Sequence, residues 1–311
     1  MPDAVAIRPG RGLLSSAALL LALFGCASPP PHGYSGAAIT VYAAGDIADC
    51  RYRAPESSGA AVTASLVEAG LAANPGAHVL TLGDHTYPVG LAAEFNDCYH
   101  PTWGRFKERT FPAPGNHEYY SKGAAGYYAY FGARAAPEQG GYYSVQLGKW
   151  RVISLNSTLR GAAFDAQLAW LRKDLAQHPA LCALAFWHHP RYSSGGHADN
   201  PYMAPVWQAL AEAGIELGLA AHDHDYERFA PQDAQGVRDD DRGMRQFVVG
   251  TGGAWLTPVR FAAANSESRN NASHGVLRLD LFDNGYTWEF LAAGQDAAEP
   301  AFSDRGAAPC H

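Results

Sequence analysis

The feature that most constrains this chain is a series of short apolar stretches, each of which runs into an Asp, Asn or His side chain. Short apolar stretches bounded by turn residues indicate buried β-strands. In layered α/β folds, functional side chains gather at the carboxyl ends of the strands, so we expect these side chains to meet at one edge. The five junctions are Gly45-Asp46, Gly83-Asp84, Gly115-Asn116-His117, His188-His189-Pro190 and Ala221-His222-Asp223-His224.

Segments with helical spacing lie between these stretches. Gly148-Lys149 predicts a hairpin turn, and Asn284-Gly285 predicts a second one within 275–291. Because hairpins join antiparallel strands, we expect mixed sheets rather than purely parallel ones. The expected strands cover 39–44, 78–82, 110–113, 142–147, 150–155, 182–187, 215–220 and 246–249, and the expected helices cover 57–73, 164–177 and 203–213.

The N-terminus has the pattern of an export signal. An apolar run at 13–24 follows two arginines and is too short to span a bilayer as a helix, so residues 1–25 are expected to be a signal peptide. A small residue before Cys26 resembles a bacterial lipobox, which predicts a lipid on Cys26; a plain secretory peptide is the alternative. Residues 26–36, rich in Pro, Ser and Gly, predict a flexible tether before a single domain at 37–311.

The remaining cysteines are Cys50, Cys98, Cys182 and Cys310. Four cysteines in an exported chain suggest two disulfides with three possible connectivities, and free buried thiols are the alternative. We favour Cys50–Cys98, because each follows a loop of the expected site. We also favour Cys182–Cys310, because Cys182 opens a core strand and Cys310 lies in a Gly/Ala-rich tail that needs anchoring.

The charge of the chain excludes one class of partner. The formal net charge is -7 and there is no run of Lys or Arg, so no nucleic-acid groove is expected. An anionic protein that handles an anionic substrate needs local positive charge, which metal ions can supply.

The junction residues have the chemistry of metal ligands. Asp, Asn and His suit hard or borderline cations such as iron, zinc and manganese. Two adjacent ions can share a carboxylate, hold a phosphoryl group and lower the pKa of a bridging water. His222 and His224, two residues apart in an extended segment, point the same way and can each reach one ion. A single junction is ordinarily a turn or a surface loop, but five in this order predict a two-metal site.

The motif set resembles the calcineurin-like metallophosphoesterase superfamily over nearly all of 39–311. Two motifs are similar to the purple acid phosphatase branch: Gly-Asp-x-x-Tyr at 83–87 and His-x-His-x-Tyr-Glu-Arg at 222–228. Ala48 stands where many members have a His ligand. Ala221 replaces a Gly, and it would be strained if that position required a positive φ.

The resemblance implies an α/β fold of four layers, with two packed mixed sheets flanked by helices. It also implies a first ion held by Asp46, Tyr87, His224 and one oxygen of Asp84. Tyr87 predicts iron(III) in this position, because a phenolate stabilises a hard trivalent ion. The second ion, which is zinc, manganese or iron(II), is expected to bind the other oxygen of Asp84 together with Asn116, His188 and His222.

The reaction implied is hydrolysis of a phosphate monoester, as in an acid phosphatase, by attack of a metal-bound hydroxide. His117 is expected to act as general acid or to hold substrate, or else to orient Asp84. His197 resembles a substrate-side His of the branch, with an ordinary loop His as the alternative.

Four neighbouring residues are expected to have other roles. His189 is expected to turn away from the metals. His85 is expected to line the mouth of the site. Glu227 and Arg228 are expected to form a supporting ion pair beneath it.

Other functions remain open from the sequence. A phosphodiesterase or nucleotide hydrolase would use the same metal core, a phosphate-binding surface protein would use it without catalysis, and an oxidoreductase would use an iron pair. The expected substrate is a small phosphate ester. The expected location is extracytoplasmic, either secreted or anchored to a membrane only through lipid on Cys26, and the oligomeric state stays open.

Overall fold

The computed structural model describes Met1 and residues 33–259, 261–293 and 302–311. The stretch His32–His311 clusters as one compact unit. The expected signal peptide at 1–25, the lipid on Cys26 and most of the tether at 26–36 lie outside the described residues. Among the helices of the described part, none combines the length and apolar character that crossing a membrane requires.

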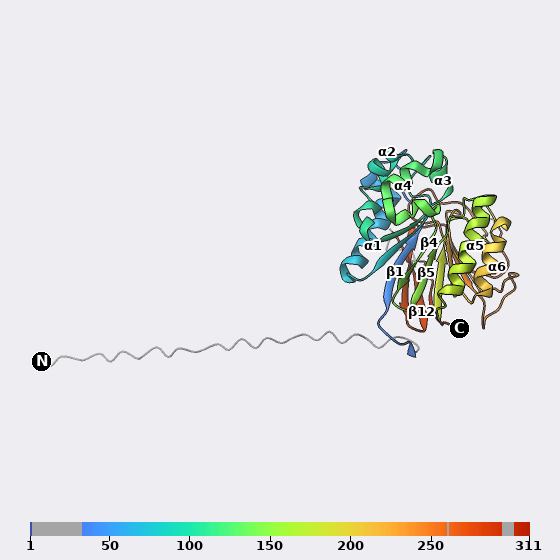
Figure 1. The fold of residues 1–311 in the computed structure, drawn as a ribbon. Coiled ribbons are helices and arrows are strands. Elements are labelled where there is room, and N and C mark those ends of the chain that lie inside the picture. Colours follow the sequence, from blue (N-terminus) through green and yellow to red (C-terminus); the bar gives the residue numbers. More distant parts are fainter. Residues whose placement is uncertain (2–32, 260, 294–301) are drawn as a thin grey trace. The chain divides into compact units, whose positions relative to one another are not determined.

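Two mixed β-sheets form the centre of this unit, as Figure 1 shows. The first contains β1 (Ile39–Ala44), β2 (His78–Leu82), β3 (Thr110–Ala113), β11 (Gly275–Phe282), β12 (Gly285–Ala292) and β13 (Arg305–Pro309), in the order β13-β12-β11-β1-β2-β3. The second contains β4 (Tyr143–Leu147), β5 (Trp150–Ser154), β6 (Cys182–Phe186), β7 (Leu217–Ala220), β8 (Tyr226–Phe229), β9 (Arg245–Val249) and β10 (Ser266–Asn270), in the order β10-β8-β9-β7-β6-β5-β4.

Helices cover the outer faces of the sheets. They are α1 (Gly59–Ala73), α2 (Ala92–Glu94), α3 (Asn116–Tyr119), α4 (Ala125–Phe131), α5 (Ala162–Gln177) and α6 (Ala204–Glu212). Short 3₁₀ and π turns are η2 (Pro55–Ser57), η3 (Phe95–Tyr99), η4 (Trp103–Arg109), η5 (Lys122–Ala124), η6 (Gly132–Ala135), η7 (Pro137–Gln139) and η8 (Pro201–Met203). In Figure 1, α1–α4 lie on one side of the sheets and α5 and α6 on the other, which is the four-layer arrangement expected from the sequence.

The strand β6 shows how this layering follows from the sequence. Leu184 and Phe186 belong to the core that includes residues of both sheets, whereas Ala183 and Ala185 belong to the core beneath α5 and α6. All five residues of β6 are buried, because both faces of the second sheet are covered. A strand covered on both faces reads as an unbroken apolar stretch rather than an alternating one.

The parallel strands place the junction residues. β1, β2 and β3 are parallel neighbours in the first sheet. β5, β6, β7 and β9 are parallel neighbours in the second. The carboxyl ends of each parallel block therefore lie at one edge, and the loops that follow β1, β2, β3, β6 and β7 carry the five junctions.

The expected elements agree closely with the structure where local pattern decides them. The expected strands at 39–44, 78–82 and 110–113 coincide with β1, β2 and β3. Both hairpins form, as antiparallel pairs β4–β5 and β11–β12. The helix expected at 57–73 begins at Gly59, because the Ser58 side chain caps it by accepting a hydrogen bond from the Ala61 amide at 3.3 Å.

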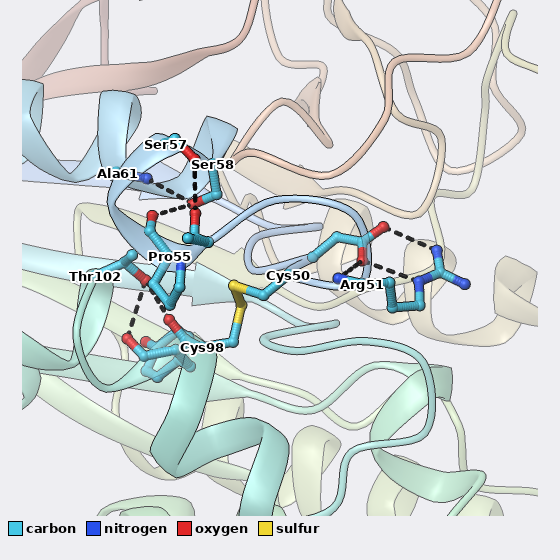
Figure 2. Close-up of a disulfide and its surroundings, with 11 residues drawn as sticks. Cys50, Arg51, Pro55, Ser57, Ser58, Ala61, Cys98 and Thr102 are labelled. Carbon is cyan, nitrogen blue, oxygen red and sulfur yellow. Dashed lines mark hydrogen bonds and ion pairs between the residues drawn. A yellow bond between two sulfur atoms is a disulfide. The ribbon is translucent and has the colours of Figure 1, made fainter.

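The structure confirms both disulfide pairings. Cys50–Cys98 joins the loop after β1 to η3, with Cα atoms 5.8 Å apart (Figure 2). Cys182–Cys310 joins the first residue of β6 to the residue after β13, with Cα atoms 5.5 Å apart. The first cross-link lies near the ligand edge, and the second lies at the amino end of β6.

Candidate metal centre

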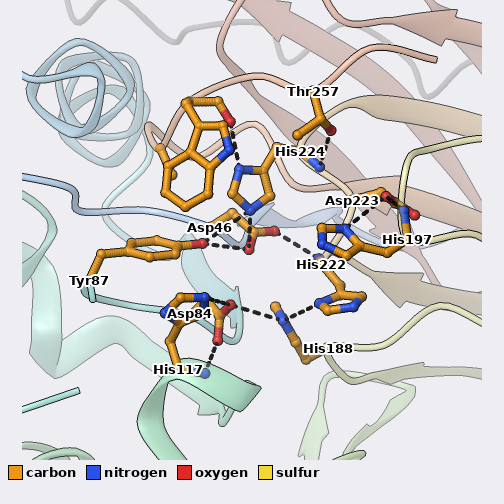
Figure 3. A network of polar contacts seen from close by, with 12 residues as sticks. Asp46, Asp84, Tyr87, His117, His188, His197, His222, Asp223, His224 and Thr257 are labelled. Carbon is orange, nitrogen blue, oxygen red and sulfur yellow. Dashed lines mark hydrogen bonds and ion pairs between the residues drawn. The ribbon is translucent and has the colours of Figure 1, made fainter. Parts of the chain in front are cut away.

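The five junctions meet at the carboxyl edge of the two sheets, where Figure 3 shows their side chains turned toward one another. Backbone hydrogen bonds tie the two edges together, since the Gly45 amide donates to the Val249 carbonyl at 2.9 Å and the Gly252 amide donates to the Gly45 carbonyl at 2.9 Å. The residues expected as ligands are Asp46, Asp84, Tyr87, Asn116, His188, His222 and His224.

Three of these residues have a left-handed backbone. The φ angles of Asp46, Asp84 and His222 are 57°, 49° and 72°. Such conformations cost roughly 1–3 kcal/mol each and cluster at functional sites. Ala221 is not among the positive-φ residues, so the strain considered for it from the sequence is absent, and His222 adopts the left-handed conformation instead.

Gly45 is required for space rather than for its backbone angle. A Cβ at Gly45 would lie 2.5 Å from the Ala221 Cβ and 3.0 Å from the Leu82 carbonyl oxygen. The loop after β1 can therefore approach the loop after β7 only because residue 45 has no side chain.

One group of donor atoms is formed by Asp46, Tyr87 and His224. The Tyr87 hydroxyl donates to Asp46 Oδ1 at 2.8 Å and lies 3.2 Å from His224 Nε2, which is 3.3 Å from Asp46 Oδ1. The His224 ring is oriented by its Nδ1, which donates to the Trp255 carbonyl at 2.5 Å. Burial, together with the Asp46 and Asp84 carboxylates, raises the pKa of Tyr87 well above its usual value.

A second group is formed by Asp84, Asn116, His188 and His222. His188 Nε2 lies 3.2 Å from Asp84 Oδ2, 3.0 Å from Asn116 Oδ1 and 3.2 Å from His222 Nδ1. The other ring nitrogen of His188 donates to the Leu82 carbonyl at 2.8 Å, which directs Nε2 into the group. Suitable donor atoms of Asp84, His188 and His222 all lie within 4.8 Å of one another.

The charges of the second group fit a cation. Burial lowers the pKa of His188, but the Asp84 carboxylate outweighs it and raises that pKa to about 9. Burial, followed by the charge on His188, lowers the pKa of His222 to about 3. The proton on His188 is therefore shared among two imidazoles, the Asp84 carboxylate and the Asn116 amide oxygen, all of which lie around His188 Nε2. A metal ion in place of that proton would satisfy all four donors.

The sequence model of the family described as calcineurin-like phosphoesterase matches residues 39–226, a range that contains all five junctions. The chain belongs to the calcineurin-like phosphoesterase family. Membership implies a metal-dependent phosphoester hydrolase with a binuclear metal centre. No curated protein sequence matches the chain.

Solved structures share the fold of this phosphoesterase at low sequence identity. Purple acid phosphatase PPD1 from yellow lupin seeds has a TM-score of 0.64 at 16% identity, over 87% of this chain and 54% of the lupin chain. GAP50, the anchor in the inner membrane complex of Plasmodium, has a TM-score of 0.64 at 14% identity, over 87% and 89% of the two chains. PhoD has a TM-score of 0.55 at 10% identity, over 88% and 69%.

These similarities confirm the predicted metallophosphoesterase fold. This chain spans about half the length of the lupin enzyme.

His117 lies at the rim of the second group of this phosphoesterase. Its backbone amide donates to Asp84 Oδ1 at 2.8 Å, and its ring Nε2 is 3.8 Å from Asp84 Oδ2. Its Nδ1 donates to the Pro88 carbonyl at 2.6 Å, so in the neutral ring Nε2 carries no proton. The backbone of His117 therefore orients Asp84, while its partly exposed ring faces the site.

His197 lies on the solvent side of the second group. Its ring centroid is 4.3 Å from that of His222, and its side chain is 48% exposed. Its Nδ1 is 3.1 Å from Asp223 Oδ1, and this hydrogen bond raises the pKa of His197. Ser193 holds the other oxygen of Asp223 through its hydroxyl at 2.5 Å. The His197 ring is thus oriented by Asp223 and accessible beside the donor atoms.

Glu118 is a functional residue that the sequence reasoning missed. Its fully buried carboxylate accepts hydrogen bonds from the backbone amides of Asp84, His85 and Gly115, at 3.0, 2.8 and 2.7 Å. It therefore holds together the loops after β2 and β3. The available signal was the position of Glu118 in the first turn of α3, where an acidic side chain reaches back to the residue before the helix.

His85 is not at the mouth of the site, so that expectation is wrong. Its side chain is fully buried, with its ring 4.9 Å from Phe131 and 5.4 Å from Tyr99. Its Nε2 is 2.7 Å from the Thr81 hydroxyl. The chain direction after Asp84 turns residue 85 into the aromatic core instead of toward solvent.

The expected ion pair between Glu227 and Arg228 is also wrong. Successive residues of a strand point to opposite faces, and β8 separates these two. The Glu227 carboxylate accepts from the Ser194 hydroxyl at 2.5 Å, whereas Arg228 pairs with Asp304 at 2.7 Å.

His189 packs against the second group with its ring 4.4 Å from that of His222. Its Nδ1 is 2.9 Å from the Ser157 hydroxyl. Within the part of the chain that the structure describes, His189 makes no hydrogen bond to a donor oxygen of either group.

Proposed function

We propose that this protein is an exported two-metal phosphatase that hydrolyses phosphate monoesters. The observation that supports it most is the pair of adjacent donor groups joined by one residue. Asp84 Oδ2 lies 3.2 Å from His188 Nε2 in the second group, and the backbone carbonyl of Asp84 accepts a hydrogen bond at 2.9 Å from the amide of Ile47, the neighbour of Asp46 in the first group. A carboxylate placed between two groups of donors suits a pair of ions that share it.

In this proposal Asp46, Tyr87 and His224 hold the first ion, while Asn116, His188 and His222 hold the second. Tyr87 favours iron(III) in the first position, since a phenolate is a hard anionic donor. The imidazoles favour zinc, manganese or iron(II) in the second. When bound, such ions lower the pKa of a water and neutralise charge on phosphoryl oxygens.

The residues around the ions would position and protonate the substrate. His197, which is oriented by Asp223 and whose pKa is raised by that hydrogen bond, is placed to donate a proton to the leaving oxygen. His117, with Nδ1 fixed on the Pro88 carbonyl, offers Nε2 at the other rim to hold a phosphoryl hydroxyl. Neither His117 nor His197 is among the seven residues proposed as metal ligands, so both side chains can act on the substrate.

Export is proposed from the sequence pattern at 1–25 and from the two disulfides, which persist in oxidising compartments. We propose that a lipid on Cys26 holds the domain near a membrane through the tether at 26–36. Mass spectrometry of the mature protein would detect an acylated N-terminal cysteine, and a free N-terminus beyond residue 26 would exclude it.

The direct test of the proposed function combines three measurements on one purified sample: metal content, visible spectrum and ester hydrolysis. We expect about two metal ions per chain, a tyrosinate-to-iron(III) band, and faster hydrolysis of phenyl phosphate than of bis(4-nitrophenyl) phosphate. A colourless protein with two zinc or manganese ions would keep the hydrolase and remove the iron. Preference for the diester would establish a phosphodiesterase. A protein that binds phosphate but hydrolyses neither ester would be a binding protein.

A further inference from the structure

One exposed aromatic ring of this protein lies against the first donor group. Among the described residues, the exposed Trp, Tyr and Phe side chains are Tyr52, Tyr120, Trp255 and Phe261. Trp255 is the one whose ring contacts side chains of the first donor group. Its centroid is 4.6 Å from that of His224 and 5.1 Å from that of Tyr87, yet the residue is 47% exposed. A large apolar ring left open beside buried polar donors points to a binding surface.

The backbone around Trp255 is fixed to two of the expected ligands. The Trp255 carbonyl accepts from His224 Nδ1 at 2.5 Å, and the Ala254 amide donates to the Asp46 carbonyl at 2.9 Å. The Thr257 amide donates to the His224 carbonyl at 3.0 Å. The segment 254–257 is therefore held on both sides of the indole, so the ring is presented in a defined position before any ligand arrives.

Arg51 contacts the indole of Trp255. Its guanidinium carbon lies 5.2 Å from the Trp255 ring centroid. Two hydrogen bonds to the Asp49 carboxylate, at 2.9 and 2.8 Å, fix the guanidinium, and the adjacent Cys50 is anchored to Cys98. Because Asp49 already neutralises Arg51, its contribution here is to hold the ring rather than to bind an anion.

We propose that Trp255, braced by Arg51, determines specificity by stacking on an aromatic ring attached directly to the scissile oxygen of the substrate. The inference rests on the proposed phosphatase function. In an aryl phosphate the ring begins one bond from the ester oxygen, so a phosphoryl group at the donor atoms places it beside Trp255. A nucleobase is separated from its phosphate by a ribose and would lie farther out. The chemical class is therefore aryl phosphates.

Tyr120 is a less suitable platform, although it is also exposed. Its hydroxyl accepts from the Asn116 side-chain amide at 2.9 Å, and its ring lies 4.7 Å from that of His117. One edge of the ring is thus used to orient a residue of the second donor group. Tyr120→Ala consequently tests whether the loss of an exposed ring beside the second donor group alters the same preference.

The test measures ring preference, defined as kcat/KM for phenyl phosphate divided by kcat/KM for glycerol phosphate, with adenosine monophosphate as a third substrate. Trp255→Ala is expected to lower the preference about tenfold, which corresponds to about 1.4 kcal/mol of stacking. Trp255→Phe is expected to keep it within about twofold, because a ring remains. Tyr120→Ala and the exposed Leu181→Ala are expected to leave the preference unchanged. Metal content is measured for each variant.

A binding measurement tests the same point without turnover. Calorimetry on the metal-loaded protein gives the affinity for phenylphosphonate relative to that for methylphosphonate. This ratio is expected to fall about tenfold in Trp255→Ala, as the kinetic preference does. Equal losses for both phosphonates would mean that Trp255 acts only through His224, and would overturn the proposal. Loss confined to adenosine monophosphate would replace the aryl class by nucleotides and overturn it too.

Failure of the proposed function gives a different result. A wild-type protein that hydrolyses none of the three esters, but whose preference for phenylphosphonate disappears in Trp255→Ala, would keep the aromatic platform and remove the phosphatase. An absence of any preference for phenylphosphonate in the wild type would remove the platform alone.

Discussion

The two donor groups share one edge of the fold but differ in chemistry. The group of Asp46, Tyr87 and His224 contains two oxygen donors and one nitrogen, and its members hydrogen-bond to one another. The group around His188 brings two imidazole nitrogens together, with a carboxylate and an amide oxygen. Hard trivalent ions favour oxygen and borderline divalent ions favour imidazole. The difference in donor atoms therefore supports the proposal that the two adjacent positions take unlike ions.

The two groups also differ in their support. His224 depends on the carbonyl of an exposed loop residue, Trp255, whereas His188 depends on the carbonyl of Leu82 inside β2. Glu118 adds three further hydrogen bonds beneath Asp84 and the loop that carries Asn116. The second group is therefore held by more of the surrounding backbone than the first. Variants that affect one group and not the other test this difference.

Asp84→Asn should have the largest effect, because it removes the residue that joins the groups. We expect activity to fall on the order of a thousandfold, since several kcal/mol of transition-state stabilisation depend on the paired ions. Metal analysis should show fewer than two ions per chain. Asp165→Asn, on the exposed start of α5, is the control. Normal turnover with two bound ions would contradict a shared Asp84.

Glu118→Gln should destabilise the second group more than the first. Gln cannot accept from all three amides that Glu118 now binds, and we expect the free energy of unfolding to fall by about 3 kcal/mol at pH 7. Metal at the second position should be lost before metal at the first. The exposed Glu108→Gln is the control, and equal loss of both ions would show that Glu118 does not favour one group.

The pH dependence of the metal-free protein tests the same carboxylate. Burial raises the pKa of Glu118, but His85 and the surrounding N–H groups lower it below its ordinary value of 4.5. A depressed folded pKa gives stability that is present above 4.5 and is lost as the pH falls through the folded value. Urea unfolding between pH 7 and pH 3 should show a smaller loss in Glu118→Gln than in the wild type.

His197→Ala should spare both groups and affect only proton transfer. We expect kcat for glycerol phosphate to fall roughly a hundredfold, and kcat for phenyl phosphate to fall less, because phenolate leaves without a proton. The hydrogen bond that His197 donates to Asp223 raises the pKa of His197, so wild-type activity on glycerol phosphate should decline as the pH rises through that pKa. Persistence of this decline in the variant would assign the proton to another group.

Tyr87→Phe should have the smallest effect and act on the first group alone. The other donors of the first group remain, so we expect the affinity for the first ion to fall about tenfold. The affinity for the second ion should be unchanged. The visible band should disappear. Tyr119→Phe removes a nearby phenol that bonds to Tyr128 and Asn156, and should leave the band intact. A band unchanged in Tyr87→Phe would exclude Tyr87 as an iron ligand.

Local sequence pattern predicted much of the fold. β1, β2 and β3 are short apolar stretches bounded by turn residues, and their bounds were predicted to the residue. β10 and β13 were missed because Ser266–Asn270 is polar and Arg305–Pro309 is a Gly/Ala-rich tail. These strands exist because they pair with β8 and β12, and such pairing is decided by tertiary contacts.

The part of the site that lies directly at the ends of strands could be predicted from the sequence. The seven residues expected as ligands gather there because parallel strands end at a common edge. The direction of side chains beyond that edge was not readable, so His85 and the partners of Glu227 were wrongly expected. Trp255 carries no motif at all, and its position follows from backbone contacts that join distant segments.

The two disulfides bear on how long the protein survives. Cys50–Cys98 closes the fold beside the metals, and Cys182–Cys310 fastens the end of the chain at the amino end of β6. In the extracytoplasmic location proposed above, an opened chain would meet proteases and would not be refolded, so the rate of opening would set its lifetime. Cross-links at both ends of the sheets slow that opening wherever it starts. The same enzyme without them could be equally active when fresh and yet be lost sooner.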